Sequence, residues 1–62
     1  MVTINKVMEK CYIVKFGDMY FDLYIDINEC GNYECFFFDE YIEAKTINDL
    51  KNRVKKFIVL HA

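Results

Sequence analysis

The side chains that could do chemistry are few, and the first candidates are two carboxylates in the segment MYFDLYIDI. Asp22 and Asp26 stand four residues apart in a run of alternating apolar and polar residues. Such alternation is typical of a β-strand, which sends successive side chains to opposite faces. Four strand residues span about 13 Å, too wide for two carboxylates that act on one glycosidic bond. We therefore expect no acid–base pair here.

The three cysteines and the single histidine are the next candidates. Cys11, Cys30 and Cys35 are an odd number of thiols, so they cannot form a closed set of disulfides. No CxxC pair and no second histidine accompanies His61, and such pairs are the usual signature of zinc ligands. No nucleophile stands next to a base that could activate it, and we expect so small a domain to enclose little pocket space. The sequence predicts reduced, half-buried thiols, no metal, no cofactor and no enzymatic activity.

The composition is that of one small domain rich in core-forming residues. Of the 62 residues, 55% are hydrophobic and 18% aromatic, with two glycines and no proline. These values argue against disorder and leave no room for a linker. No apolar run approaches the length of a membrane span or of a signal peptide. We expect a single domain over residues 1–62 that is cytoplasmic, in a bacterial host cell if a phage encodes it.

Two strands joined by a tight turn are the clearest structural signal. The segments CYIVKF and MYFDLYIDI flank Gly17-Asp18. Glycine tolerates the positive φ that tight hairpin turns require, so this pair predicts a two-residue turn. Phe16 then faces Met19, and the further pairs on that face are almost all apolar, which supports the register.

A second hairpin is predicted around Asp39-Glu40 in the segment YECFFFDEYIEAK. With that turn, Phe37 faces Ile42 on the inner side of the sheet. On the other side Glu34 faces Lys45 as an opposite-charge pair, which favours the same register.

A loop over residues 28–32 connects the two hairpins and sets Ile27 opposite Tyr33. The inner faces then match across four consecutive strands, for which a meander is the simplest arrangement. Residues 1–10 stay open between an early strand and a short helix.

The last third of the chain changes to a helical period. Thr46 can cap the N-terminus with Asp49 three residues on, and lysines near the end suit the negative end of the helix dipole. The apolar stripe consists of Ile47, Leu50, Val54, Phe57 and Ile58. We predict an α+β fold, in which one C-terminal amphipathic helix packs on one face of a four-stranded antiparallel meander sheet.

Three consecutive phenylalanines, residues 36–38, cannot all enter one core, because a strand sends neighbours to opposite faces. A shift of that strand by one residue would expose Phe37 and Cys35 instead, so at least one phenylalanine faces outward in either register. One helix covers one face of the sheet, so the other face stays open. The open face is predicted to carry Ile13, Tyr20, Asp22, Tyr24, Asp26, Glu34, Phe36, Phe38, Tyr41 and Glu43. Exposed apolar patches of this extent usually mark the binding site of a partner.

Charge is distributed unevenly behind a formal net value of −2. Residues 17–49 contain nine acidic side chains and one base, whereas residues 50–62 contain four bases and no acid. Residues 1–16 contribute three bases and one acid, which completes the sum of −8, +4 and +2. We expect an acidic sheet and a helix with a basic exterior.

An acidic face with aromatic anchors suits a basic protein surface, since charge steers the encounter and buried rings supply affinity. Basic grooves occur mostly on proteins that handle nucleic acid, and a small acidic sheet can compete there with the phosphate backbone. In size, acidity and composition the chain is similar in kind to phage inhibitors of host nucleases, uracil-DNA glycosylase and CRISPR effectors. The sequence predicts a non-enzymatic inhibitor of such a host defence enzyme, anti-CRISPR-like or DNA-mimic-like, that acts through protein binding.

Three alternatives stay open. The open face could form a homodimer, or its rings could serve only as cross-strand pairs that stabilise the sheet. The helix could bind nucleic acid through Lys51, Arg53, Lys55 and Lys56, although a pI near 5.2 and a single arginine oppose this. The segment EAKTINDLKNRVKKFI resembles the strand-to-helix junction of HicB-type antitoxins, which implies an antitoxin-like or regulatory subunit.

Overall fold

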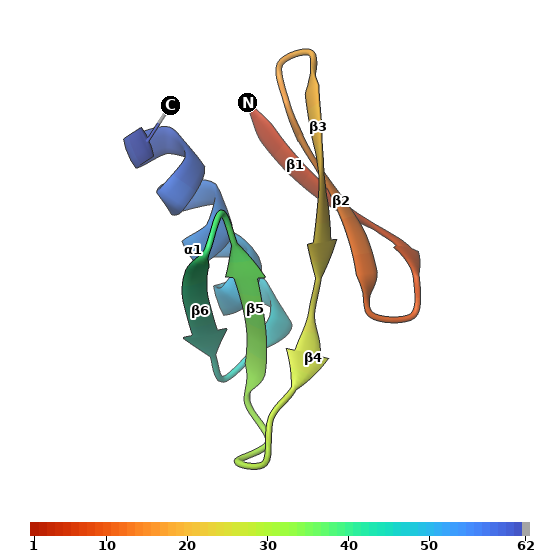
Figure 1. Cartoon of the computed structure of the whole chain (residues 1–62), viewed down its shortest axis with the longest axis vertical. Helices are drawn as coiled ribbons and strands as arrows, with labels where there is room; N and C mark the ends of the chain where they lie inside the picture. The colour runs from red at the N-terminus through yellow and green to blue at the C-terminus, as the bar shows by residue number, and fades with distance from the viewer. Residues whose placement is uncertain (62) are drawn as a thin grey trace.

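A computed structural model describes residues 1–61, in which six strands precede one helix (Figure 1). The strands are β1 (Val2–Met8), β2 (Cys11–Phe16), β3 (Met19–Tyr24), β4 (Asp26–Ile27), β5 (Tyr33–Phe37) and β6 (Glu40–Ala44), followed by α1 (Ile47–His61). The α+β class is confirmed. The single four-stranded meander is wrong, because the strands form two antiparallel sheets of three strands each, β1-β2-β3 and β4-β5-β6.

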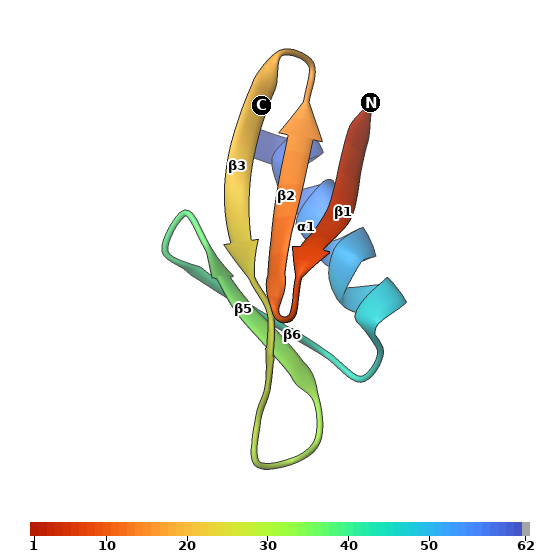
Figure 2. The same ribbon diagram turned by 90° about the vertical axis from the view of Figure 1, so that its right-hand side faces the viewer.

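The division between the two sheets lies at Ile25, in the middle of the predicted long strand. Ile25 is buried, and its backbone N–H donates to the carbonyl of Lys10 at 2.9 Å, in the turn between β1 and β2. The chain beyond it pairs with β5 instead of continuing beside β2. Figure 2 shows the first sheet in front of α1, with β5 and β6 running obliquely to it. The alternation of apolar and polar residues is therefore unbroken, but residues 19–24 pair with β2 and residues 26–27 pair with β5.

The N-terminal segment, which the sequence left open, is a strand. β1 pairs with β2 from Val2 opposite Phe16 to Met8 opposite Cys11, with an irregularity between Lys6 and Met8. Val2 is buried, so the early apolar alternation extends the core by a fifth long strand.

The first predicted hairpin is confirmed in its register. Phe16 faces Met19 across the turn, and Gly17 has a φ of +61°. A side chain at this φ would be strained, which explains the glycine. The loop 28–32 is also confirmed, with Ile27 opposite Tyr33.

The second hairpin turns one residue earlier than predicted. The turn residues are Phe38 and Asp39, both at positive φ (+50° and +65°), and Phe37 faces Glu40. Positive φ at both central residues is the type I′ geometry, whose twist matches that of the flanking strands. The predicted pair of Glu34 with Lys45 is therefore wrong, because Glu43 faces Glu34 instead.

The helix begins and packs as predicted. The backbone N–H of Asp49 donates to Thr46 Oγ1 at 3.1 Å, which is the expected N-cap. Leu50 and Val54 are fully buried against both sheets. Among residues 1–61 the buried side chains are Val2, Ile4, Val14, Leu23, Ile25, Cys35, Phe37, Ile42, Ala44, Leu50, Val54 and Ile58.

One helix does not cover the whole inner side of the sheets. A helix of 15 residues is about 22 Å long, whereas the nine residues from Met19 to Ile27 extend over about 30 Å. Met19 and Ile27, at the two ends of this segment, are accordingly exposed, although the alternation assigns both to the same face as the buried Leu23 and Ile25.

The three phenylalanines have three different environments. Phe37 is 3% exposed and lies in the core, whereas Phe36 points to the opposite side of the sheet. Phe38 lies in the turn, so its prediction as a third outward residue of the strand is wrong. The earlier turn ends the strand before Phe38, which frees its ring from the alternation.

Candidate functional site

The side of the two sheets that faces away from α1, here called the outer face, exposes large aromatic rings. Phe36 is 69% exposed and Tyr24 is 56% exposed. Phe36 lies opposite Tyr41 across β5 and β6, with the ring centroids 5.2 Å apart. Cross-strand aromatic pairs stabilise sheets, but this pair leaves most of the Phe36 ring in water. Pairing within the sheet therefore does not account for the exposed ring.

Phe36 and Tyr24 come from different sheets and line one shallow hollow of about 470 Å³. Val7 and Met8, at the end of β1, contribute two further exposed apolar side chains. The full lining is Val7, Met8, Cys11, Tyr12, Ile13, Asp22, Leu23, Tyr24 and Phe36. The hollow joins the outer faces of both sheets into one surface, with the exposed carboxylate of Asp22 at its border.

Three of the predicted carboxylates form one row across the second sheet. Asp26 is opposite Glu34, and Glu34 is opposite Glu43. Like charges in directly opposite positions destabilise a sheet unless other groups stabilise them. The Tyr41 hydroxyl supplies one such bond, since it donates to Glu34 Oε1 at 2.8 Å. This bond to a carboxylate also raises the pKa of Tyr41.

Asp26 is the member of the row that has a cation of its own. Its carboxylate accepts the backbone N–H of Ile27 at 2.8 Å and lies 3.1 Å from Lys10 Nζ. The bond from Ile27, followed by the one from Lys10, lowers the pKa of Asp26. Because Lys10 compensates this charge, Asp26 contributes less to a negative surface than the sequence predicts.

Glu43 is stabilised by neutral donors from the loop 28–32. Its Oε2 accepts hydrogen bonds from the side-chain amides of Asn28 and, at 3.0 Å, Asn32. These bonds, Asn32 first, lower the pKa of Glu43. Among residues 1–61 no lysine or arginine nitrogen lies within 4.0 Å of a carboxylate oxygen of Glu34 or Glu43. Glu34 therefore carries a charge without a paired cation, two residues before Phe36 on the same face, whereas Glu43 shares two surface hollows with Arg53.

Not all predicted residues join this surface. Tyr20 is exposed but lies beside Lys15, whose Nζ is 5.6 Å from the centre of its ring, near the β2–β3 turn. Phe38 lies on the helix side, where its ring contacts Phe21 at a centroid distance of 5.1 Å. The structure thus places Asp22, Tyr24, Asp26, Glu34, Phe36, Tyr41 and Glu43 together on the outer face, with Tyr20 on the same face nearer the β2–β3 turn, and leaves Phe38 on the helix side.

Several residues of this surface were missed. Lys10 pairs with Asp26, and Asn28 and Asn32 orient Glu43. The segment NECGN carried a signal for the last two, since Asn side chains readily bond to nearby groups in turns. Val7 and Met8 had no such signal, because the structure of residues 1–10 was not predicted.

The thiols do not assemble into a site. Cys35 is buried, and burial raises its pKa to about 11. Cys11 is half-buried and Cys30 is exposed in the loop. Within residues 1–61 there is no group of three His, Cys, Asp or Glu side chains that could hold a metal ion.

On the helix side of the sheets lies an apolar hollow of about 490 Å³, here called the cavity, which is open to solvent because Met19 and Phe38 of its lining are exposed. Since it is not enclosed, it does not contradict the expectation of little enclosed pocket space. The described helix, at 15 residues, is too short and too polar to cross a membrane. No family model matches the chain, and neither a curated protein nor a solved structure shows significant similarity to it.

Proposed function

We propose that the protein is a non-enzymatic binding module that docks its outer face onto the basic surface of a partner protein. The observation that carries this proposal is Phe36, a ring 69% exposed beside the hollow that it shares with Tyr24. A ring of this kind acts as an anchor when a partner buries it, and rings are over-represented among the residues that dominate binding energy.

Charge supports a basic partner. Glu34 and Glu43 form the cross-strand pair next to that of Phe36 and Tyr41, Glu34 has no paired cation, and Asp22 lines the hollow. Opposite charge on the partner would accelerate the encounter, and the apolar hollow would then supply most of the affinity.

In its most specific form, the proposal is that the module inhibits a nucleic-acid-handling host defence enzyme, as phage-encoded inhibitors do. A carboxylate-bearing face that occupies a basic groove would exclude the phosphate backbone from it. Nucleic-acid binding by α1 is the weaker candidate, because Lys51 Nζ lies 5.4 Å from the centre of the Tyr12 ring and the exposed apolar Val59 and Leu60 follow the basic residues in the last turn.

The test uses the immobilised protein to capture partners from a bacterial lysate, followed by affinity measurements on the purified partner. Replacement of Phe36 by Asn should weaken binding at least about tenfold, because an anchor ring is lost. The matched control is Phe38→Asn, which changes the same residue type two positions later and outside the outer face. Asp22→Lys should slow association and leave dissociation nearly unchanged.

Two results would contradict the proposal. One is a partner whose affinity is the same for wild type and Phe36→Asn. The other is a stable dimer, in light scattering over a dilution series, that dissociates on Phe36→Glu, since the outer face would then bind a second copy.

A further inference from the structure

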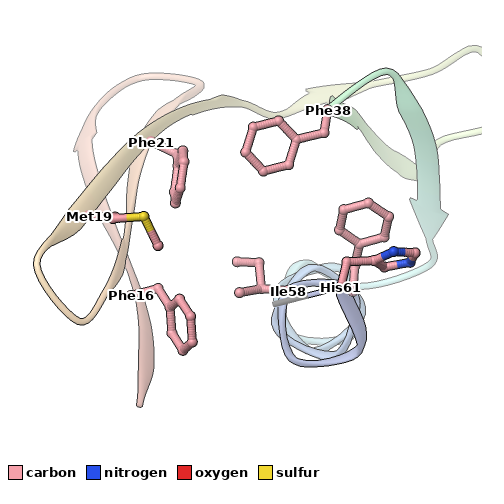
Figure 3. Close-up of a pocket in the computed structure, with 7 residues that line it drawn as sticks. Phe16, Met19, Phe21, Phe38, Ile58 and His61 are labelled. Atoms are coloured by element: carbon pink, nitrogen blue, oxygen red, sulfur yellow. The ribbon is translucent and has the colours of Figure 1, made fainter.

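The apolar cavity on the helix side is separate from the outer face. Figure 3 shows its walls, which come from the β2–β3 hairpin, the β5–β6 turn and the C-terminal part of α1. The lining residues are Phe16, Met19, Phe21, Phe38, Phe57, Ile58 and His61, and none of them lines the hollow around Phe36. A volume of about 490 Å³ is in the range of small-molecule sites.

The aromatic rings that line the cavity contact one another and the core. Phe21 makes edge contacts with Phe37 and Phe38, at centroid distances of 5.8 and 5.1 Å. Phe57 contacts Phe37 at 6.0 Å and stacks on His61 at 4.4 Å. Because Phe37 belongs to the buried core, these contacts anchor the walls to the folded structure.

Phe38 reaches this position at a conformational cost. Its φ of +50° is unusual for a bulky side chain, which clashes with its own backbone in that region. Strained residues of this kind persist where the surrounding structure holds them, and they are concentrated at functional sites. Here the strained backbone places an aromatic ring in the wall of the cavity, between Phe21 and α1 (Figure 3).

The chemistry of the lining restricts the occupant. Four phenylalanines, a methionine and an isoleucine offer ring faces, ring edges and aliphatic groups, and His61 is the polar side chain among them. No carboxylate, lysine or arginine of residues 1–61 lines the cavity, so an ionised ligand would lose its hydration without gaining a counter-ion. Fused or single aromatic rings would gain edge and face contacts.

We propose that this cavity binds a neutral aromatic ring compound, held by edge and face contacts with the phenylalanine rings of the lining. The site is independent of the outer face and of the function proposed for it. It adds a small-molecule binding site to a chain whose other surface is suited to a protein.

The test is a fluorescence titration with Nile red, a neutral fused-ring dye. Wild type should bind the dye at one saturable site, and nuclear Overhauser contacts should join the dye to the methyl groups of Ile58. Phe38→Asn should weaken dye binding about tenfold, because one wall is removed. Asn also tolerates the positive φ of this turn, so the variant should stay folded. The matched control Phe36→Asn should leave dye affinity unchanged.

Met19→Glu is a second variant, in case Phe38→Asn alters the turn. It places a carboxylate in the cavity wall at an exposed position, and it should also weaken dye binding. The proposal is overturned if wild type shows no saturable binding, or if Phe36→Asn and Phe38→Asn lower dye affinity equally. It is also overturned if the dye dissociates a dimer, since a second copy would then occupy the cavity. A failure of Phe36→Asn to weaken partner binding would refute only the function of the outer face.

Discussion

The β2–β3 and β5–β6 hairpins form tight turns in different ways. In the β2–β3 turn Gly17 takes the positive φ, and an added Cβ would meet no atom within 4 Å. In the β5–β6 turn Phe38 and Asp39 both take positive φ, although neither is a glycine. Phe38 also has partners, since its ring lies 4.6 Å from that of Phe37 and 5.1 Å from that of Phe21.

A tight turn can therefore be stabilised either by a residue whose backbone tolerates positive φ or by the contacts of its side chains. The first turn requires a residue that tolerates positive φ, and there is room for a side chain at this position. The second accepts strain in the backbone because ring contacts, each worth about 0.5–1.5 kcal/mol beyond burial, offset it. The first turn should therefore be sensitive to β-branched residues, and the second to loss of the ring.

The largest effect is expected at Gly17. Gly17→Val places a β-branched side chain at a φ of +61°, which should lower the free energy of unfolding by about 2 kcal/mol. Urea denaturation measures this value. Gly17→Asn is the control and should cost less than half as much, since Asn tolerates this region. Equal losses would indicate that the glycine is required for another reason.

A smaller effect is expected at Phe38, where two opposing contributions can be separated. Phe38→Ala removes the ring and keeps most of the strain, so it should cost about 1 kcal/mol. Phe38→Gly removes the ring and the strain together, and should cost less than Phe38→Ala. If Phe38→Gly proved the less stable of the two, the backbone at residue 38 would not be strained in the folded protein.

The smallest effect concerns acid and is confined to the second sheet and its loop. The folded pKa of Glu43 is lowered from 4.5 by the amides of Asn32 and Asn28. A lowered folded pKa stabilises the protein above the unfolded pKa, and this stabilisation is lost as the pH falls through the folded value. Wild type should therefore lose more stability between pH 5 and pH 3 than Glu43→Gln, in urea denaturation at both pH values. Identical losses would contradict a role for these bonds.

The parts of the fold that were predictable depend on local chemistry. Gly17-Asp18 fixed the first register, and Thr46 with the apolar stripe located the helix, because each signal involves residues close in sequence. The second turn was not predictable in the same way. Placing it at Phe38 and Asp39 instead of Asp39-Glu40 slides the strands by two residues, which leaves every side chain on the same face. The hydrophobic pattern is identical in both registers, and the pairing of Glu34 with Lys45 favoured the wrong one.

The split at Ile25 and the surfaces that follow from it were not predictable either. Period-two alternation assigns a face to each residue but does not name the neighbouring strand. The outward positions of Phe36 and Tyr24 could be predicted, whereas their shared hollow depends on how two sheets meet. The cavity depends on the limited length of α1 and on the backbone of Phe38, which no pattern encodes.

The order of the strands has a consequence for the entropy of folding. Each pairing joins strands that are neighbours in sequence, β1 with β2, β2 with β3, β4 with β5 and β5 with β6. The chain thus closes only short loops while the sheets form, and the cost of closure grows with loop length. The contact of α1 with β1 closes the longest loop, because it joins the first element of the chain to the last. Most of the topology is therefore of low contact order, a property associated with rapid folding.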